Sequence, residues 1–406
     1  MSAGYEFAEQ KHLNAAPPIV PQPAHHTAVR ANRAIAKVAL ILVTLSTFQR
    51  ILRDADLGGA GWRQGDWLIN SSAGPVRHAW FGDAVLLFAD LFNVNPVTII
   101  LALQAVLVAF VMAAFWIALR RTGWSTPLVL IAISPAALLF WFNDPIGALR
   151  KELLVFAAMS VVLLAPRSRL ALAFAAAVFA IGVTAHEGLV LFLPVFLVAF
   201  WLIWSSGGSG RAALVAAIFC TLTALISLVY MAMHSYVADT SAICDALVER
   251  GAGGGICSGA IGYLSNTLEF AVEGRSTTSW SEIWRFLGCS FLTLITFSLV
   301  WPDARVRIRV GIGFIFALLL FLPLTVVASD WGRWLNYAAM SVLFLLLLKA
   351  GLDGPSKRTN MPHRLVFWGV LLLNGVWVLP HSVEFAGPEA ILPELAGDLY
   401  RAFTRD

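Results

Sequence analysis

The sequence predicts an all-α protein, a polytopic transmembrane helical bundle of about eleven spans. Hydrophobic residues make up 59% of the 406 residues and charged residues only 13%, whereas a soluble domain carries about 25% charged residues. Apolar segments of roughly 17 to 24 residues recur along the chain, a length that crosses about 30 Å of hydrocarbon. The basic residues behind the net charge of +4 are scattered in short loops. This pattern orients membrane helices and excludes nucleic acid as a partner.

The chain begins with a segment that has no apolar core. Residues 1–34 contain Glu6, Glu9 and several prolines. They are not a signal peptide, and they are predicted to form a flexible cytoplasmic tail. The transmembrane domain is predicted to cover 35–380, with spans at 35–51, 96–119, 125–143, 148–165, 170–185, 188–204, 212–234, 283–301, 310–328, 334–350 and 365–380.

Two further segments are predicted to lie at the membrane surface. Residues 82–92 are too short to cross the bilayer and include Asp83 and Asp90, so they predict an interfacial or re-entrant helix. Residues 381–406 carry apolar side chains at helical spacing and predict an amphipathic tail on the outer face.

The basic residues fix the expected orientation. They fall on alternate loops of one side, which the positive-inside rule makes cytoplasmic: Arg30, Arg33, Lys37, Arg120, Arg121, Arg167, Arg169, Arg211, Arg305, Arg307, Arg309, Lys357, Arg358 and Arg364. The N-terminus is then cytoplasmic, the C-terminus lies outside, and the long outer loops are 52–95 and 235–282. Cys244 and Cys257 share the second outer loop, where they form a disulfide or remain free thiols.

Four polar clusters interrupt the apolar segments, and this topology puts all of them on the outer face. They are 66–77, 144–152, 186–187 and 330–333. Charged groups at the membrane border cost a few kcal/mol each unless they face a partner or a wet cavity. The sequence therefore predicts one outward-facing polar site.

In the 144–152 cluster, Asn-Asp-Pro and a glycine end one helix, and Arg150, Lys151 and Glu152 begin the next. Successive helical side chains point about 100° apart, so at least one of the three is expected to face the interior. Arg150 and Lys151 are candidates to bind an anion, and Glu152 is a candidate catalytic acid. The alternative is an interfacial anchor in which the helix dipole favours Glu152.

His186 and Glu187 mark a tight reversal within an apolar stretch too long for one span. Glu187 is a candidate general base, because burial raises the pKa of a carboxyl group toward neutral pH. His186 is a candidate substrate ligand. Capping of the adjoining helices is the alternative. The pair is not a metalloprotease motif, since position 190 is Val190.

The 330–333 cluster offers Arg333 at a helix start, where a guanidinium fork suits phosphate. Asp330 is grouped with it as a substrate ligand, and Trp331 could stack on a sugar ring. A tryptophan belt with an Asp330–Arg333 ion pair is the alternative.

The first outer loop combines an acid, arginines and tryptophans, a composition suited to a sugar phosphate. Asp66 is the main candidate for a catalytic carboxylate, Arg77 for phosphate binding and Trp67 for sugar stacking. An exposed loop acid is the alternative for Asp66. No spacing of His, Asp or Glu requires a metal or other cofactor, although a divalent cation is compatible with the site.

These features resemble bacterial membrane glycosyltransferases of the GT-C type and the related O-antigen and exopolysaccharide polymerases. The resemblance is a hydropathy pattern over most of the chain, and at residue level it covers only 66–77 and 144–152, which also resemble proteins of bacterial polysaccharide loci. It implies an inner-membrane location, a polyprenyl-phosphate-linked or diphosphate-linked sugar as substrate, and polysaccharide-assembly proteins as partners besides membrane lipid. The first loop lacks the paired acids common in these enzymes.

The expected reaction is direct glycosyl transfer. Arg77, Arg150 and Arg333 would stabilise the lipid diphosphate as it leaves, while Asp66 or Glu187 accepts the proton of the attacking hydroxyl. Two alternatives belong to other classes: a transporter or flippase for a lipid-linked saccharide, and a non-catalytic subunit of an assembly complex. The absence of an internal repeat and the position of the clusters on one side favour the enzyme.

Overall fold

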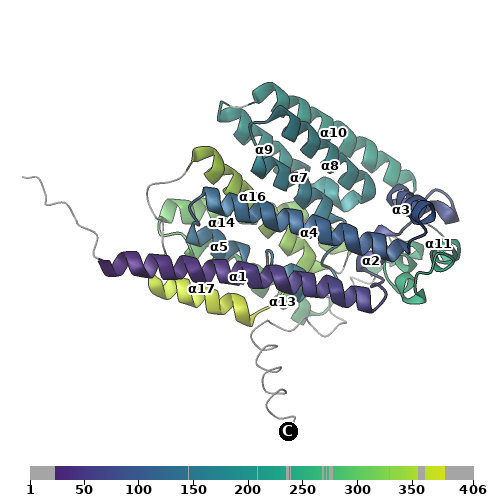
Figure 1. Cartoon of the computed structure of the whole chain (residues 1–406), viewed down its shortest axis with the longest axis horizontal. Helices are drawn as coiled ribbons and strands as arrows, with labels where there is room; N and C mark the ends of the chain where they lie inside the picture. The colour runs from purple at the N-terminus through teal and green to yellow at the C-terminus, as the bar shows by residue number, and fades with distance from the viewer. Residues whose placement is uncertain are drawn as a thin grey trace, which may run out of the picture.

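The computed structural model describes residues 23–379, apart from 145, 208, 235–236, 238, 268, 271, 274–277, 329 and 355–361. Within these residues all regular elements are helices, as predicted (Figure 1). The longer helices are α1 Pro23–Asp56, α4 Pro96–Arg121, α7 Glu152–Leu164, α8 Arg169–Ala185, α9 Leu193–Ser205, α10 Gly210–Met233, α13 Trp280–Leu299, α14 Ala304–Phe321, α16 Trp331–Asp353 and α17 Arg364–Val376.

Shorter elements connect them. They are α2 Arg63–Trp67, η1 Ser71–Ala73, α3 Ala79–Phe92, α5 Thr126–Ala132, α6 Phe140–Asn143, η2 Glu187–Phe192, α11 Ser241–Val248, η3 Gly254–Ser258, η4 Gly262–Ser265 and α15 Leu324–Val327.

The described residues hold six helices long and apolar enough to cross a membrane, so the protein is a multi-pass membrane protein. They are Ala31–Asp56, Pro96–Arg121, Glu187–Ser205, Gly210–Met233, Trp280–Leu299 and Trp331–Asp353. The prediction of about eleven spans is wrong. Three of the other predicted spans are apolar helices of only 13, 17 and 13 residues, namely α7, α8 and α17. A fourth, α14, begins with three arginines.

The predicted span 125–143 is broken into α5 and α6. Pro135 cannot continue a helix because it lacks a backbone N–H and clashes with the preceding turn. The irregular segment still lies in the interior, and the Asn336 side chain of α16 donates to the carbonyls of Ala136 and Ala137 at 3.0 and 2.9 Å. An irregular backbone is tolerated in a membrane protein when its polar groups are paired in this way.

The two predicted terminal segments, 1–34 and 381–406, lie partly or wholly outside the described residues. Helix α1 begins at Pro23, so the predicted tail is shorter than 1–34, and residues 1–22 lie outside the described part. The predicted outer tail 381–406 also lies outside it.

The predicted surface helix 82–92 is present as α3. Its Val85 and Ala89 are buried, whereas Leu87 and Leu91 are exposed. The exposed face of α3 is thus also largely apolar, which suits a helix that contacts lipid at a membrane surface. Its position relative to a bilayer stays a prediction.

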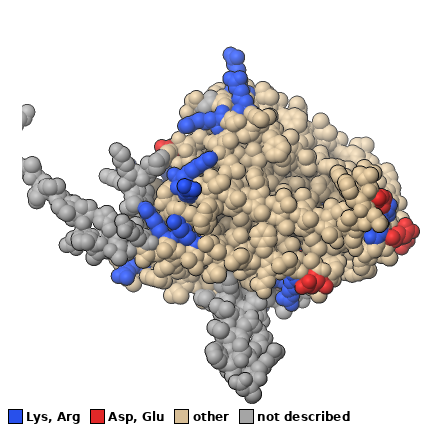
Figure 2. Space-filling model, viewed as in Figure 1, with Lys and Arg blue, Asp and Glu red and all other residues tan. Residues whose placement is uncertain are grey.

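The core lies where α4, α7 and α16 meet. Helix α7 packs against α8 and α4, α10 covers α8 and α9, and α14 packs on α16 and α13 (Figure 1). Phe156, Phe192 and Tyr337 bring α7, η2 and α16 together, with ring centroids 4.9 to 6.3 Å apart. Most Lys and Arg visible in Figure 2 lie at the left, the end opposite α2, α3 and α11. Lys and Arg are thus unevenly distributed between the two ends of the bundle in this view, and the predicted orientation depends on such a difference.

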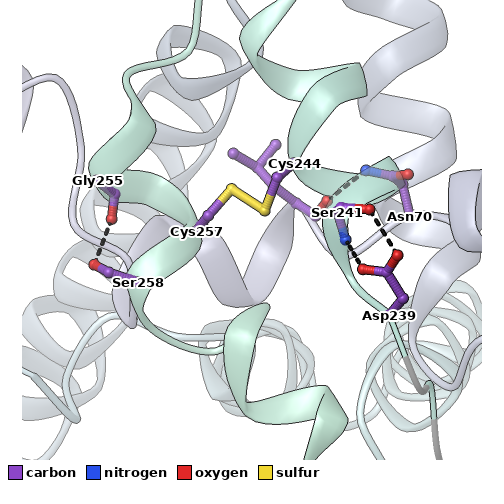
Figure 3. The surroundings of a disulfide bond; sticks show 8 residues. Asn70, Asp239, Ser241, Cys244, Gly255, Cys257 and Ser258 are labelled. Carbon is purple, nitrogen blue, oxygen red and sulfur yellow. Dashed lines mark hydrogen bonds between the residues drawn. A yellow bond between two sulfur atoms is a disulfide. The ribbon is translucent and has the colours of Figure 1, made fainter.

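Of the two alternatives for Cys244 and Cys257, the structure has the disulfide. It joins α11 to η3 with a Cα–Cα distance of 5.9 Å (Figure 3). Two further contacts fix the same segment to the α3–α4 turn: Asn95 Nδ2 donates to Gly251 O at 2.6 Å, and Arg250 pairs with Asp90 at 2.6 Å. Cys220 of α10 and Cys289 of α13 are free thiols.

We expect a Cys244→Ser, Cys257→Ser variant to loosen this segment. The bond closes a loop with a sequence separation of 13, and a loop of that size contributes about 3 kcal/mol. Limited trypsin cleavage after Arg250, inside the loop, should therefore become at least about tenfold faster. Cys289→Ser is the matched control and should leave the rate unchanged. Equal cleavage of the disulfide-free variant and the native protein would contradict the prediction.

Candidate functional site

A single cavity of about 620 Å³ brings the four polar clusters together. Its charged floor comes from α2, the segment before α3, the segment before α7, the α8–η2 junction and the start of α16. The floor residues are Asp66, Arg77, His78, Arg150, His186, Glu187, Asp330 and Arg333. The predicted convergence of distant polar clusters is therefore present in the structure.

The segment before α7 is shaped by local hydrogen bonds. Asp144 Oδ1 accepts from the backbone N–H groups of Ile146 and Gly147 at 2.8 and 2.7 Å, an Asx-type turn. Leu149 has φ of 60°, in the left-handed region that non-glycine residues rarely adopt. Such strain persists only where the surroundings hold it.

Two buried side chains hold the backbone at Leu149. Its carbonyl accepts from Gln104 Nε2 at 2.6 Å and from Trp67 Nε1 at 3.3 Å. The next residue is Arg150, so α2 and α4 together fix where its guanidinium enters the cavity. Sequence reasoning missed Gln104, although an amide inside an apolar span was the available signal.

A buried polar network extends this support below the floor. Asp54 of α1 forms an ion pair with Arg63 of α2, and both are almost fully buried. Gln64 Nε2 donates to Gln104 Oε1 at 2.7 Å. Buried polar groups rigidify a structure when they satisfy one another. The network therefore links α1, α2 and α4 beneath the cavity.

Two carboxylates and two guanidinium groups dominate the centre of the floor. Asp330 Oδ2 lies 3.0 Å from Arg150 Nη1 and 3.0 Å from Arg333 Nη1, and Arg150 Nε lies 3.6 Å from Asp66 Oδ2. The Asp330–Arg333 pair considered from sequence is thus present, and both residues still face the cavity. The Nε groups of Arg150 and Arg333 are buried without a hydrogen-bond partner in the described part of the chain. Arg150 and Arg333 thus have unused hydrogen-bonding capacity next to the cavity that both residues line.

Asp66 and Lys151 form the buried centre of charge. Burial raises the pKa of Asp66, but the positive charges of Lys151, Arg150 and Arg333 outweigh it and hold the pKa below its usual range. Burial lowers the pKa of Lys151 to about 8, against the opposing charges of Asp66 and Glu187. Asp66 is therefore ionised at neutral pH.

Lys151 lies behind the floor and does not line the cavity. Its side chain has 0% exposure, and its Nζ has no hydrogen-bond partner within the described residues. Direct phosphate binding by Lys151 is thus unsupported. Its ammonium acts on the cavity through its charge, which is weakly screened at this depth.

Glu187 is held by its neighbours at the other side of the floor. It accepts from Arg77 Nη1 at 3.1 Å, and His78 Nε2 lies 2.7 Å from its other oxygen. His186 Nδ1 accepts from Gly188 N–H at 3.0 Å, so the capping role considered from sequence is present. With Nδ1 occupied, the neutral His186 ring carries its proton on Nε2.

His78 was not singled out from the sequence. Its ring centroid lies 4.9 Å from that of His186. Burial lowers the pKa of His186 to about 4, and burial together with the positive charge of Lys151 lowers the pKa of His78 well below its usual value. Both rings are neutral at neutral pH.

We expect stability to fall in mild acid because of these histidines. Imidazole in an unfolded chain titrates near about 6.5, whereas His186 in the folded protein titrates at about 4. The unfolded state binds more protons between these values, so the His186 contribution is complete above pH ~6.5 and is lost toward pH ~4, by up to about 3 kcal/mol. Thermal unfolding in detergent at pH 7.5 and 5 measures it. His186→Asn, which can still accept from Gly188, should reduce the slope; an unchanged slope would contradict this assignment.

Besides Lys151, three predicted site residues do not reach the cavity. Glu152 is 1% exposed and accepts from Arg150 N–H at 3.2 Å and from the Tyr337 hydroxyl at 3.1 Å. It fixes the backbone beside Arg150, and its predicted catalytic role is unsupported. Trp67 is fully buried, and Trp331 donates its indole N–H to Thr325 O away from the cavity. Neither ring is placed to stack on a sugar.

Other aromatic side chains line the cavity instead. They are Trp62, Tyr263 and Trp334. Trp62 belongs to the same predicted outer loop as Trp67, and Trp334 follows Trp331 by about one helical turn. The aromatic side chains that line the cavity therefore lie in the predicted segments but at other positions. Tyr263 lies in the second outer loop, which gave no polar cluster and no signal.

Within the described part of the chain, no group of three or more His, Cys, Asp or Glu is arranged to hold a metal ion. No family model, curated protein or solved structure matches this chain. Fold and site together define a multi-pass helical membrane protein in which the helix ends enclose one charged cavity.

Proposed function

We propose that the protein is a membrane glycosyltransferase that acts on a sugar linked to a polyprenyl phosphate or diphosphate. The observation that carries the proposal is the convergence of Arg77, Arg150 and Arg333 with Asp66 and Glu187 on one cavity. Guanidinium groups with unpaired buried donors suit a phosphate, and carboxylates beside them suit an attacking hydroxyl.

The apolar wall of the cavity supports a lipid-borne substrate. Leu228, Met231 and Ala232 of α10 form one part of this wall, and Leu324 and Ala328 at the ends of α15 form another. Leu228 is also 43% exposed on the outer surface of α10. The wall is therefore continuous with a surface that faces hydrocarbon if α10 spans the membrane. A polyprenyl chain could stay in the bilayer while its phosphate reaches the floor.

The reaction balances without a further reagent. The acceptor hydroxyl oxygen forms a bond to the anomeric carbon as the bond from that carbon to the phosphate oxygen breaks. The hydroxyl proton moves to Asp66 or Glu187, and the electron pair leaves on the phosphate. Arg77, Arg150 and Arg333 stabilise the charge that develops there.

The setting follows from the same proposal. The cavity would open at the outer face of a bacterial inner membrane, with a cytoplasmic N-terminus and polysaccharide-assembly proteins as partners. The Lys and Arg at the opposite end of the bundle in Figure 2 support this orientation.

A flippase is the second candidate, because an apolar wall beside a charged floor would also fit a lipid-linked sugar in transit. Purified protein in vesicles with a fluorescent polyprenyl-diphosphate sugar in one leaflet separates the two. We expect a glycosylated acceptor to form without transfer of intact lipid between leaflets. Movement of unchanged lipid with no product would instead support the flippase. If neither product nor lipid movement is seen, the non-catalytic assembly subunit is the remaining alternative.

A further inference from the structure

One part of the cavity lining comes from the second outer loop, and it differs from the floor in charge. We call residues 260–267 the roof; those lining the cavity are Ala260, Tyr263, Leu264, Asn266 and Thr267. None of residues 260–267 is charged. The cavity therefore has a charged floor, an apolar wall and an uncharged polar roof.

The roof and the floor meet at an aromatic pair. The ring centroids of Tyr263 and Trp62 lie 5.7 Å apart at an interplanar angle of 55°. The Arg150 guanidinium lies 5.6 Å from the centroid of Trp62. A sugar that lies next to this aromatic pair would therefore have its phosphate within reach of Arg150.

The roof also presents unused hydrogen-bonding groups. Within the described residues, neither the Tyr263 hydroxyl nor the Asn266 side-chain amide has a hydrogen-bond partner. The Thr267 hydroxyl accepts from Phe270 N–H at 3.2 Å, which leaves its own proton to donate. Uncharged donors and acceptors beside aromatic rings match a ring that carries several hydroxyl groups.

Close backbone contacts hold the roof in place. Ala260 N–H donates to Gly61 O at 3.1 Å, and a Cβ on Gly259 would lie 2.2 Å from the Gly61 carbonyl carbon. A Cβ on Gly65 would lie 2.6 Å from Ile256 O. The glycines permit this approach, and the Cys244–Cys257 bond in Figure 3 restrains the segment just before the roof. The aromatic pair is therefore organised before a ligand arrives.

From this arrangement we infer that the roof and Trp62 form a carbohydrate subsite for a neutral, hydroxyl-rich sugar ring, which lies against Trp62 and Tyr263 while its phosphate contacts the floor. The inference rests on the proposed function and adds the position and the charge class of the sugar. An acidic sugar would bring a carboxylate to a roof that has no cation of its own, while Arg150, the guanidinium next to Trp62, already faces Asp66 and Asp330 and would also hold the phosphate.

The test measures binding, not turnover. The probes are a polyprenyl phosphate, the same lipid bearing a neutral hexose, and the same lipid bearing a uronic acid. For the native protein we expect the lipid that bears the hexose to bind about tenfold more tightly than the bare lipid phosphate, and we call this ratio the hexose gain. The lipid that bears the uronic acid should show a smaller gain. Tyr263→Ala should reduce the hexose gain to about twofold or less and leave the affinity for the bare lipid phosphate unchanged. Tyr263→Phe, which keeps the ring, should retain most of the gain.

Tyr230→Ala is the matched control, because Tyr230 is exposed on α10 and does not line the cavity. An unchanged hexose gain in Tyr263→Ala, or equal binding of all three lipids by the native protein, would overturn the sugar subsite and leave the phosphate site standing. If the native protein binds none of the lipids, both the subsite and the proposed function fail.

Discussion

An Arg150→Ala, Arg333→Ala variant should lose sugar transfer by about a thousandfold or more. Removing one donor to a developing negative charge costs about 10²- to 10³-fold in rate, and this variant removes two guanidinium groups. Both converge on the same Asp330 oxygen at 3.0 Å and both face the cavity. The initial rate of transfer from a polyprenyl-diphosphate sugar is the measurement.

Loss of two buried cations could also impair folding, so two further variants are needed. Arg150→Lys, Arg333→Lys keeps both charges and loses the forked geometry, and it should show an intermediate rate with near-native thermal stability. Arg169→Ala removes an exposed arginine at the start of α8 and should leave the rate unchanged. Full activity in the double alanine variant would exclude the arginines from the reaction.

Asp66→Asn should reduce both transfer and stability, and a second substitution should separate the two effects. The rate should fall about 100-fold or more if Asp66 receives the hydroxyl proton. Stability should fall by about 3 kcal/mol, because the substitution removes the largest opposing charge from a fully buried Lys151. Thermal unfolding in detergent and the transfer rate are measured on the same samples.

The combined variant Asp66→Asn, Lys151→Met should recover most of the lost stability, because it leaves no unpaired ammonium in the interior. It should not recover the transfer rate, since the carboxylate is still missing. Recovery of both properties would show that Asp66 only balances the charge of Lys151. A native rate in Asp66→Asn alone would move the base to Glu187.

The convergence of the polar clusters was predicted from a topology of about eleven spans, and the described residues hold six helices of spanning length. Alternate loops must lie on the same side of a membrane, so the basic loops placed 66–77 and 330–333 on one face although they are far apart in the chain. The firmer part of that prediction is that charged groups inside apolar segments need partners or a wet cavity. The cavity brings residues of both clusters together.

The number of spans could not be predicted as well, because hydropathy records apolar length and not helix continuity. The apolar residues 125–143 read as one span, yet Pro135 divides them and Asn336 pairs the freed carbonyls. That partner comes from a helix distant in sequence. No local pattern contains it.

The directions of individual side chains could not be predicted from sequence either. Trp62 and Trp67 have the same chemistry in one loop, and only the single turn of α2 turns Trp67 inward toward Leu149 and leaves Trp62 at the cavity. Glu152 turns toward Tyr337 for a similar reason, since its partner lies on α16. Such choices are made by tertiary contacts.

The most direct test of the central claim is the chemical balance of the reaction. Purified protein is incubated with an isotopically labelled polyprenyl-diphosphate sugar and a hydroxyl-bearing glycan acceptor, and both products are quantified by mass spectrometry. We predict that free polyprenyl diphosphate and the extended glycan appear in equal amounts, and that neither forms with the Arg150→Ala, Arg333→Ala variant. Intact donor after prolonged incubation with a panel of sugars, or equal turnover by the variant, would contradict the proposal that this cavity transfers a sugar.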